Sequence, residues 1–490
     1  MIPPSSIETR LYINGTFHEA PHKLHLLSPI NDTPLPSVSA ATKIEAELAV
    51  KSARAAQKKW EALGTIGRKP VLVKMAGLMK ENARELALIE AMNLGRPVAE
   101  TIGEVMYAAG LWEYFAEAAQ DVLGETRNGG EGMVAVEIRQ PYGVVAAILP
   151  FNVPITMFSW KAGCALATGN TVVVKSSEKA PFSSAKLAAL AHEAGFPEGV
   201  LNVITGDGKT CGAYLAAHPD INRLSFTGST ATGREIQKLS ATSNFKALSL
   251  EMGGKSPAII FADADLKMAV EKTAFSIGWL AGQTCYANSR ILVEESVAAE
   301  FIELFKKAFI KSDPQLAFHD PTDESGSGIM PVIDQKQLTR ALSLIEDGKK
   351  HSKLLSGGHR ISDEVSRKKK GCYVANTIFL DVPEDSSLYQ EEVFAPVVII
   401  NTFSSEEQVV AMANNTQYGL SASVFTKDIS RAIRISKALD SGILAINTSS
   451  PDVCPGSIFA GWKASGSGLR DGARAGLESM MESKTISIRF

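Results

Sequence analysis

Cys285 carries the most reactive side chain of the stretch AGQTCYANSR, residues 281 to 290. Its neighbours Gly282, Gln283, Thr284 and Asn288 are small or polar, which suits an accessible thiolate nucleophile better than a packed core. Most free cysteines are nonetheless buried apolar residues, so a structural thiol stays an alternative. No histidine lies within about thirty residues on either side. Cysteine–histidine chemistry therefore has no local base, although a thiol hydrolase remains open.

Two further polar residues follow apolar, strand-like runs. Glu251 ends the run in LSLEMGG. A partly desolvated carboxylate there has a raised pKa and can act as a general base near neutral pH. Asn152 follows the run in LPFNVP, where an amide can donate to a developing oxyanion at the carboxyl edge of an α/β sheet. The alternative for Asn152 is an amide that only stabilises a turn.

Two other turns have features that suit a nucleotide. Lys175 and Glu178, three residues apart in VVVKSSEKAP, could bracket a diol such as a ribose, or form a surface ion pair. In SFTGSTATG, a glycine turn at Gly228 leads into a helix that begins near Thr230. A helix N-terminus suits a pyrophosphate, whereas the alternative is an ordinary turn in which Ser229 or Thr230 caps the helix.

The common phosphate-binding motifs are incomplete. GDGKT and EMGGKS imitate a Walker A loop, but Val203 and Ser249 stand where its first glycine is required. The third glycine of a dinucleotide fingerprint is replaced by Cys211. A P-loop NTPase is therefore not expected.

The composition limits the classes of partner. The chain has 490 residues, of which 45% are hydrophobic, and a net charge of −3, with no basic stripe for nucleic acid or a lipid surface. The five cysteines are scattered without a C-x-x-C pair, so neither a disulfide framework nor a metal site is expected. The chain has no apolar run of transmembrane length and no signal-peptide core, so we expect a cytoplasmic protein.

The elements that must position these residues alternate between helix and strand. RLYINGTFHEA predicts a hairpin with an Asn-Gly turn, and residues 42–120 have helical spacing. From residue 133 onward, short β-branched strands alternate with helices, which predicts a parallel, doubly wound sheet; a second α/β segment begins near residue 257. FAGWKASGSGLRDG is expected to be a loop, and KTISIRF a closing strand that pairs with another subunit.

The ordered set ILPFNVP, GNTVVVKSSEKAP, FTGSTATG, LEMGGKSP, GQTCYANSR, EEVFAPVV, NNTQYGLSASVFT and FAGWKASGSG closely resembles the NAD(P)-dependent aldehyde dehydrogenase superfamily, nearly from end to end. The resemblance implies an α/β fold with a Rossmann-like, doubly wound cofactor-binding domain, a second α/β catalytic domain and a small β oligomerisation element. The corresponding segments are 1–118 with 142–252 for the NAD-binding domain, 253–447 for the catalytic domain, 119–141 with 473–490 for the oligomerisation strands, and 448–472 for a substrate-side loop.

The resemblance also implies roles for single residues. Cys285 is the nucleophile, Glu251 the general base, and Asn152 the oxyanion-hole amide beside the backbone N–H of Cys285. Lys175 and Glu178 hold the adenosine ribose, and Glu392 and Phe394 contact the nicotinamide ribose and ring. The remaining cofactor contacts are Leu149, Pro150, Phe151, Gly208, Phe226, Gly228, Ser229 and Gly233.

The implied reaction oxidises an aldehyde to the carboxylic acid through a cysteine thiohemiacetal and a thioester. The acceptor is NAD because Glu178 repels a 2′-phosphate, with NADP as an alternative. The substrate tunnel is expected at Val153, Met157, Trp160, Trp279, Thr284, Tyr286 and Phe459. These include no Arg or Lys for a phosphate or carboxylate, so an apolar aliphatic or aromatic aldehyde is expected.

Two departures from the family pattern and three alternative activities remain. Phe151 stands where the family often has tryptophan, and Leu469 is inserted before Arg470 in GSGLRDG, which affects a loop near the closing strand.

A homodimer or homotetramer is expected, with no nucleic acid, membrane or metal. A CoA-acylating dehydrogenase usually lacks the base, a thiol hydrolase would not need NAD, and a non-catalytic relative would bind NAD without turnover.

Overall fold

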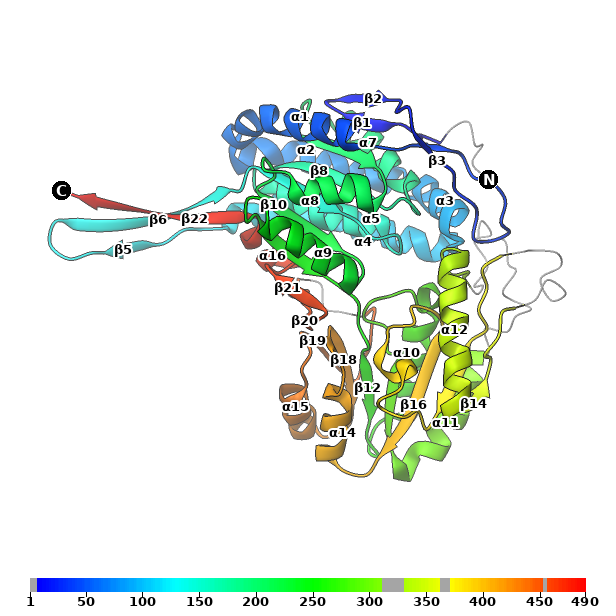
Figure 1. Cartoon of the computed structure of the whole chain (residues 1–490). Coiled ribbons are helices and arrows are strands. Elements are labelled where there is room, and N and C mark those ends of the chain that lie inside the picture. The colour runs from blue at the N-terminus through cyan, green and yellow to red at the C-terminus, as the bar shows by residue number, and fades with distance from the viewer. Residues whose placement is uncertain (1–6, 311–329, 362–370, 453–455) are drawn as a thin grey trace.

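The computed structural model describes residues 7–310, 330–361, 371–452 and 456–490. Two α/β domains lie one above the other in Figure 1, and a narrow β arm projects from the upper one. Each domain is built around its own large sheet. This arrangement confirms the expected α/β fold class.

The first domain begins with the expected hairpin, β1 (Leu11–Ile13) and β2 (Thr16–His18). Its turn residues Asn14 and Gly15 both have positive φ, as a two-residue hairpin turn requires. Four helices follow: α1 (Lys43–Ala62), α2 (Gly64–Glu81), α3 (Ala83–Leu94) and α4 (Val98–Ala118). Helix α1 starts at a capping box in which Thr42 and Glu45 satisfy each other's backbone N–H groups. A short pair, β3 (Lys23–Leu24) and β4 (Val38–Ser39), lies between hairpin and helices.

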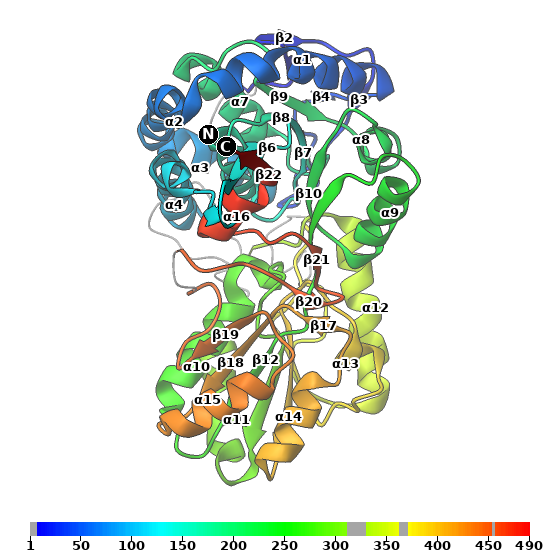
Figure 2. The ribbon, with the colours of Figure 1, turned by 90° about the vertical axis from the view of Figure 1, so that its left-hand side faces the viewer.

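The eight-stranded sheet of the first domain has the order β2-β1-β9-β8-β7-β10-β11-β21. Its five central strands are parallel. They are β7 (Val144–Ile148), β8 (Thr171–Ser176), β9 (Leu201–Thr205), β10 (Arg223–Thr227) and β11 (Ala247–Glu251). Their alternate residues enter two different cores, as Val145 and Val144 do, because helices cover both faces. The doubly wound sheet is therefore confirmed (Figure 2).

Helices α7 (Phe182–Ala194), α8 (Ala213–Ala217) and α9 (Thr230–Ala241) connect these strands. The stretch after β7 is one irregular helical run, α5 (Pro154–Phe158), the π-helix η3 (Ser159–Gly163) and α6 (Cys164–Ala167). A second π-helix, η4 (Gly208–Gly212), precedes α8. The sheet is not wholly parallel, because β1 and β21 (Gly466–Gly468) join its opposite ends antiparallel. The expectation of a plain loop in FAGWKASGSGLRDG is therefore wrong in part. Its glycines and serines have low strand propensity, yet β21 pairs with β11.

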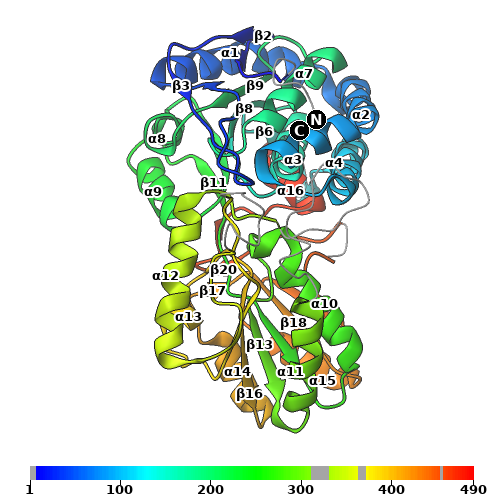
Figure 3. The same ribbon diagram turned by 90° about the vertical axis from the view of Figure 1, so that its right-hand side faces the viewer.

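The second domain contains a seven-stranded sheet in the order β14-β15-β16-β13-β12-β18-β19. Its strands are β12 (Pro257–Ile260), β13 (Arg290–Glu294), β14 (Lys353–Ser356), β15 (Thr377–Leu380), β16 (Val397–Phe403), β18 (Ser421–Phe425) and β19 (Ile443–Ile446). All pairs are parallel except β14 with β15. Its helices, seen in Figure 3, are α10 (Leu266–Gly278), α11 (Glu295–Ile310), α12 (Gln335–His351), α13 (Ser387–Gln390), α14 (Glu406–Asn414) and α15 (Ile429–Ala438).

The arm is a three-stranded antiparallel sheet of β5 (Thr126–Asn128), β6 (Met133–Pro141) and β22 (Met481–Arg489). KTISIRF is a strand, as expected, but in the described chain it pairs with β6 of the same chain, from Met481 opposite Pro141 to Arg489 opposite Met133. Short elements complete the fold: η2 (Ala119–Asp121), η5 (Trp279–Gly282), β17 (Tyr418–Gly419), β20 (Trp462–Lys463) and α16 (Ala473–Ser479). Within the described residues, no helix is both long and apolar enough to cross a membrane.

Candidate active site

The carboxyl ends of the central strands bring three expected site residues to one edge of the first sheet. Asn152 follows β7, Lys175 lies in β8 opposite Ile148, and Glu251 ends β11 opposite Thr227. Parallel strands in register end at the same side of a sheet. The chain then runs from β11 directly into β12 of the second sheet, so this edge faces the second domain.

Cys285 lies on the loop between η5 and β13, in the second domain. Leu280 and Ala281, just before it, have φ values of 54° and 53°. A left-handed conformation costs energy for residues other than glycine and often marks functional loops. Cys285 is half-buried. Burial raises the pKa of its thiol above the ordinary range, and the negative charges of Glu392 and Glu251 raise it further. The free thiol is therefore protonated near neutral pH and needs a base.

Glu251 is the carboxylate best suited to that task. Its side chain is buried, Oε2 accepts from the Gly461 backbone N–H at 3.3 Å, and Oε1 has no hydrogen-bond partner among the described residues. Burial raises the pKa of Glu251 well above its usual value, and the charge of Asp471 adds to this effect. An unpartnered carboxylate oxygen with a raised pKa can take a proton from a thiol or a water.

A buried ion pair beside Glu251 was missed by the sequence reasoning. Lys161 Nζ donates to Asp471 Oδ2 at 2.9 Å and to Ser225 Oγ at 2.7 Å, and Asp471 Oδ1 accepts from Ser249 Oγ at 2.8 Å. Both charges act on Glu251: Asp471 raises its pKa and Lys161 lowers it. A lysine inside the apolar helical run after LPFNVP was the available signal, because buried lysines are rare unless paired.

The segment Leu469–Asp471 leads from β21 into this network. Leu469 continues the backbone pairing of β21, since its N–H donates to Leu248 O at 2.8 Å. Arg470 donates to Gly461 O at 2.9 Å, on the same segment that binds Glu251. Leu469 and Arg470 are therefore held at the edge of the sheet, next to the candidate base.

Asn152 links the first domain to the nucleophile loop. Its Nδ2 donates to Gln283 O at 2.8 Å, two residues before Cys285. Gln283 is fixed in turn, because its side chain donates to Leu280 O and Pro331 O and accepts from Ile333 N. One amide hydrogen of Asn152 is thus used for positioning, and the second can meet a substrate oxygen.

The start of α9 has the geometry of an anion site. The glycine turn before it packs on buried apolar residues. Ser229 is the N-cap, and its Oγ accepts from Thr232 N at 3.3 Å. A side chain at Gly228 would meet the Phe226 ring, and one at Gly233 would meet Met252 Sδ. Phe226, expected as a cofactor contact, is buried beneath the turn. Its surroundings indicate that it supports these glycines.

Other expected cofactor residues surround Lys175. Its Nζ donates to Ser176 O at 3.1 Å and pairs with Glu178 Oε2 at 3.4 Å. Leu149 is buried, and its N–H donates to Lys175 O at 3.0 Å. Gly208 starts η4 in open space, so packing does not require a glycine there. Lys175 and Glu178, three residues apart in the chain, are thus paired at the carboxyl edge of the sheet, as a diol site needs.

The loop 391–394 reaches this edge from the second domain. Glu392 Oε1 accepts from Gly254 N at 2.9 Å, and burial raises the pKa of Glu392 to about 7. Phe394 has a φ of 57°, and its ring lies edge-on to Phe151, 5.8 Å between centroids. Phe151 lies directly between Pro150 and Asn152 in the chain, so these aromatics border the candidate site.

Three of the expected substrate residues form one aromatic cluster. The Phe459 ring lies 5.2 Å from Trp160 and 5.7 Å from Tyr286, the residue after Cys285. Val153 and Trp279 pack on a second cluster with Leu280 and Ala281. Met157 packs against the core of the first domain, and Thr284 is buried with no hydrogen-bond partner for Oγ1 among the described residues.

In the described ranges, no three His, Cys, Asp or Glu side chains gather as ion ligands would.

The family model described as Aldehyde dehydrogenase family matches residues 17–486. The chain belongs to this family. This aldehyde dehydrogenase is 39% identical to the NADP/NAD-dependent aldehyde dehydrogenase PuuC of Escherichia coli, over 99% of this chain and 96% of the relative.

Two solved structures illustrate how closely the fold of this aldehyde dehydrogenase matches its relatives. The aldehyde dehydrogenase KauB from Pseudomonas aeruginosa has a TM-score of 0.94 and 38% identity, covering 99% of this chain and 97% of that one. A mutant of the indole-3-acetaldehyde dehydrogenase AldA from P. syringae, in complex with NAD⁺ and IAA, has the same TM-score and coverage at 36% identity.

Proposed function

We propose that this aldehyde dehydrogenase oxidises apolar aliphatic or aromatic aldehydes to carboxylic acids with NAD, using Cys285 as nucleophile. The observation that carries the proposal is the convergence of three groups. Asn152 and the buried Glu251, whose Oε1 has no partner among the described residues, lie at one edge of the first sheet. The loop that carries the half-buried Cys285 meets this edge through the hydrogen bond from Asn152 to Gln283.

The residues along the same edge fit a dinucleotide. The first N–H groups of α9 have no partner within the helix, and Ser229 caps only that of Thr232. They can therefore bind a pyrophosphate. Lys175 and Glu178 together offer a donor and an acceptor to ribose hydroxyls. The relative from P. syringae was solved with NAD⁺, which supports this choice of cofactor.

The chain's own groups supply the remaining chemistry. The Cys285 thiol gives its proton to Glu251, and its sulfur adds to the aldehyde carbon to form a thiohemiacetal. The free N–H of Asn152 and the backbone N–H of Cys285 stabilise the oxyanion. NAD, when bound, accepts the hydride that this carbon loses, and a thioester remains on Cys285. Glu251 releases the first proton to solvent and then takes a proton from the water that hydrolyses the thioester to the acid.

The substrate class follows from the lining. The aromatic cluster of Trp160, Tyr286 and Phe459 offers apolar surface and contains no cation for a phosphate or carboxylate. The P. syringae relative is named for indole-3-acetaldehyde, an apolar aromatic substrate.

An aldehyde panel with NAD, followed through reduced nicotinamide, tests this function. We expect hexanal and benzaldehyde to have a higher kcat/KM than succinic semialdehyde and glyceraldehyde 3-phosphate. Cys285→Ala should abolish turnover, whereas Cys164→Ala, which changes a cysteine buried in the core, should not. Turnover by the Cys285 variant would refute the mechanism. Ester hydrolysis without NAD, or a requirement for CoA, would identify one of the other activities.

The arm supports a second proposal, that the enzyme is a homodimer or homotetramer. Ile486 and Ile488 of β22 are more than two-fifths exposed, and they lie opposite Val136 and Val134 of β6. Paired residues point to the same face, so the arm presents an apolar surface, which suits a second copy of the chain.

A further inference from the structure

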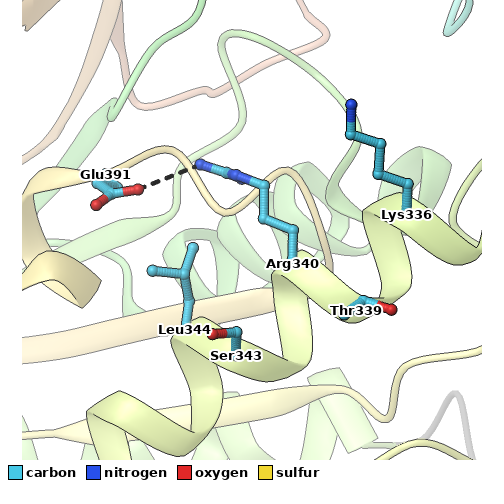
Figure 4. A pocket seen from close by; sticks show the side chains of 6 residues that line it. All are labelled: Lys336, Thr339, Arg340, Ser343, Leu344 and Glu391. Carbon is cyan, nitrogen blue, oxygen red and sulfur yellow. Dashed lines mark hydrogen bonds and ion pairs between the residues drawn. The ribbon is translucent and has the colours of Figure 1, made fainter.

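Helix α12 holds the loop 391–394 through two side chains on one face. Arg340 Nη1 donates to Glu392 O at 2.7 Å and to Val393 O at 3.1 Å, while Gln337 Nε2 donates to Val393 O at 2.8 Å and to Phe394 O at 2.9 Å. The second arm of the guanidinium pairs with Glu391 at 3.4 Å, the contact drawn in Figure 4. Two side chains one helical turn apart thus contact four consecutive residues.

The loop needs such support because its conformation is not a relaxed one. Phe394 has a φ of 57°, which is unfavourable for an aromatic side chain. The carbonyls of Glu392, Val393 and Phe394 accept hydrogen bonds from α12. Without Arg340 and Gln337, these oxygens would lose charge-assisted or amide hydrogen bonds. On the opposite side, Glu392 is anchored to Gly254 N, and any side chain at Gly253 would collide with its carboxylate. The loop is therefore held from two sides.

We propose that Arg340 and Gln337 are positioning residues that set the affinity for the nicotinamide half of the cofactor. The inference rests on the proposed function, in which Glu392 and Phe394 contact the nicotinamide ribose and ring. Neither α12 side chain has to touch the cofactor. They act by fixing the backbone that presents those two groups.

The geometry favours arginine at this position. Its planar guanidinium reaches two carbonyls with one nitrogen and a carboxylate with another, which a lysine ammonium on a flexible stem does less well. The pocket in Figure 4 shows the contrast, because Lys336 on the same helix extends away from Glu391. Lys336 is exposed and serves as a matched control for the loss of one positive charge.

The test compares two ligands bound to the intact enzyme. NADH contains the nicotinamide half, whereas ADP lacks it and reports only on the adenosine and pyrophosphate contacts. We expect Arg340→Met and Gln337→Leu each to weaken NADH binding about tenfold, the size expected when two or three hydrogen bonds to one loop are lost. ADP binding should stay unchanged, and Lys336→Met should change neither. Fluorescence and calorimetric titrations give both affinities.

Two further measurements exclude a merely structural effect. Arg340→Lys should recover part of the NADH affinity lost in Arg340→Met, and the KM for NAD should rise more than kcat falls. An equal loss of NADH and ADP affinity, or no loss of either, would overturn the inference. Because the titrations need no turnover, they remain readable even if the wild-type enzyme oxidises no aldehyde in the panel. That result would count against the proposed function alone.

Discussion

Lys161 and Asp471 are 310 positions apart in the sequence, and their side chains form a 2.9 Å ion pair in the core beside Glu251. The two charges have opposite effects on the candidate base, since Asp471 raises the pKa of Glu251 and Lys161 lowers it. The pair also bridges β10 and β11, because Lys161 donates to Ser225 and Asp471 accepts from Ser249. The same ion pair therefore contacts the strands that position Glu251 and changes the pKa of its carboxyl group.

The first prediction separates these charges by their effect on the pH–rate profile. Asp471→Asn removes a negative charge, so the pKa of Glu251 should fall and the acid limb of kcat should move to lower pH. Lys161→Met should move the limb to higher pH. Ser249→Ala, which removes a hydrogen bond to Asp471 without changing charge, is the control. Shifts in the same direction for both charge variants would contradict the assigned geometry. Each break of this buried pair should also cost about 3–5 kcal/mol of stability.

The second prediction concerns Glu251 itself. Its pKa is raised in the folded state because burial disfavours the ionised form. The protonated carboxyl therefore contributes to the free energy of unfolding, and this contribution is lost as the pH rises through the folded pKa. Glu251→Gln should abolish most turnover, and relative to wild type it should raise the melting temperature more at alkaline than at neutral pH. Differential scanning calorimetry measures the difference. A variant destabilised at both pH values would show that the buried carboxylate is not strained.

Much of this fold could be predicted because the pattern of its central strands is compatible with few sheet arrangements. The runs that became β7 to β11 are short and apolar, and alternate with helices, which specifies a parallel sheet covered on both faces. Parallel strands place the polar residues at their carboxyl ends together, so the grouping of Asn152, Lys175 and Glu251 could be predicted from the sequence. Local sequence was sufficient here because the relevant neighbours are set by strand direction.

The remaining features depend on contacts between distant segments. No local pattern pairs Lys161 with Asp471, or Asn152 with Gln283, which are 131 positions apart. Strand β21 escaped prediction because its pairing with β11 depends on backbone groups, not on apolar side chains. Phe226 is buried under Gly228 and Gly233. The sequence beside a glycine turn does not indicate which way such a side chain points.

The third prediction tests the amide of Asn152. Asn152→Ala should lower kcat by about 10²–10³-fold, the usual cost of losing one oxyanion donor, with little change in KM. It also leaves Gln283 O without its donor, so a loss of about 1 kcal/mol in stability should accompany it. Steady-state kinetics and denaturant unfolding on the same samples separate the two effects. A drop in kcat no larger than a few-fold would mean that Asn152 only positions the nucleophile loop.

The fourth prediction addresses the cofactor preference. Glu178 pairs with Lys175 at 3.4 Å, and its negative charge would repel a 2′-phosphate. Glu178→Gln keeps the shape and removes that charge, and it leaves Lys175 free to meet the phosphate. The ratio of kcat/KM for NADP to that for NAD should rise about tenfold, equivalent to about 1.4 kcal/mol. If wild type already prefers NADP, the assignment of Glu178 is wrong.

The last prediction concerns the arm. Ile486 and Ile488 lie two residues apart in β22, so both point to the same face of the sheet, together with Val136 and Val134. Charges placed there would have to be desolvated on association but stay hydrated in a free arm. The double variant Ile486→Asp/Ile488→Asp should therefore elute as a smaller species with an unchanged circular dichroism spectrum. Ser487→Asp, on the opposite face of the same strand, is the matched control. Light scattering that gives the wild-type mass for both variants would remove this face from the subunit interface.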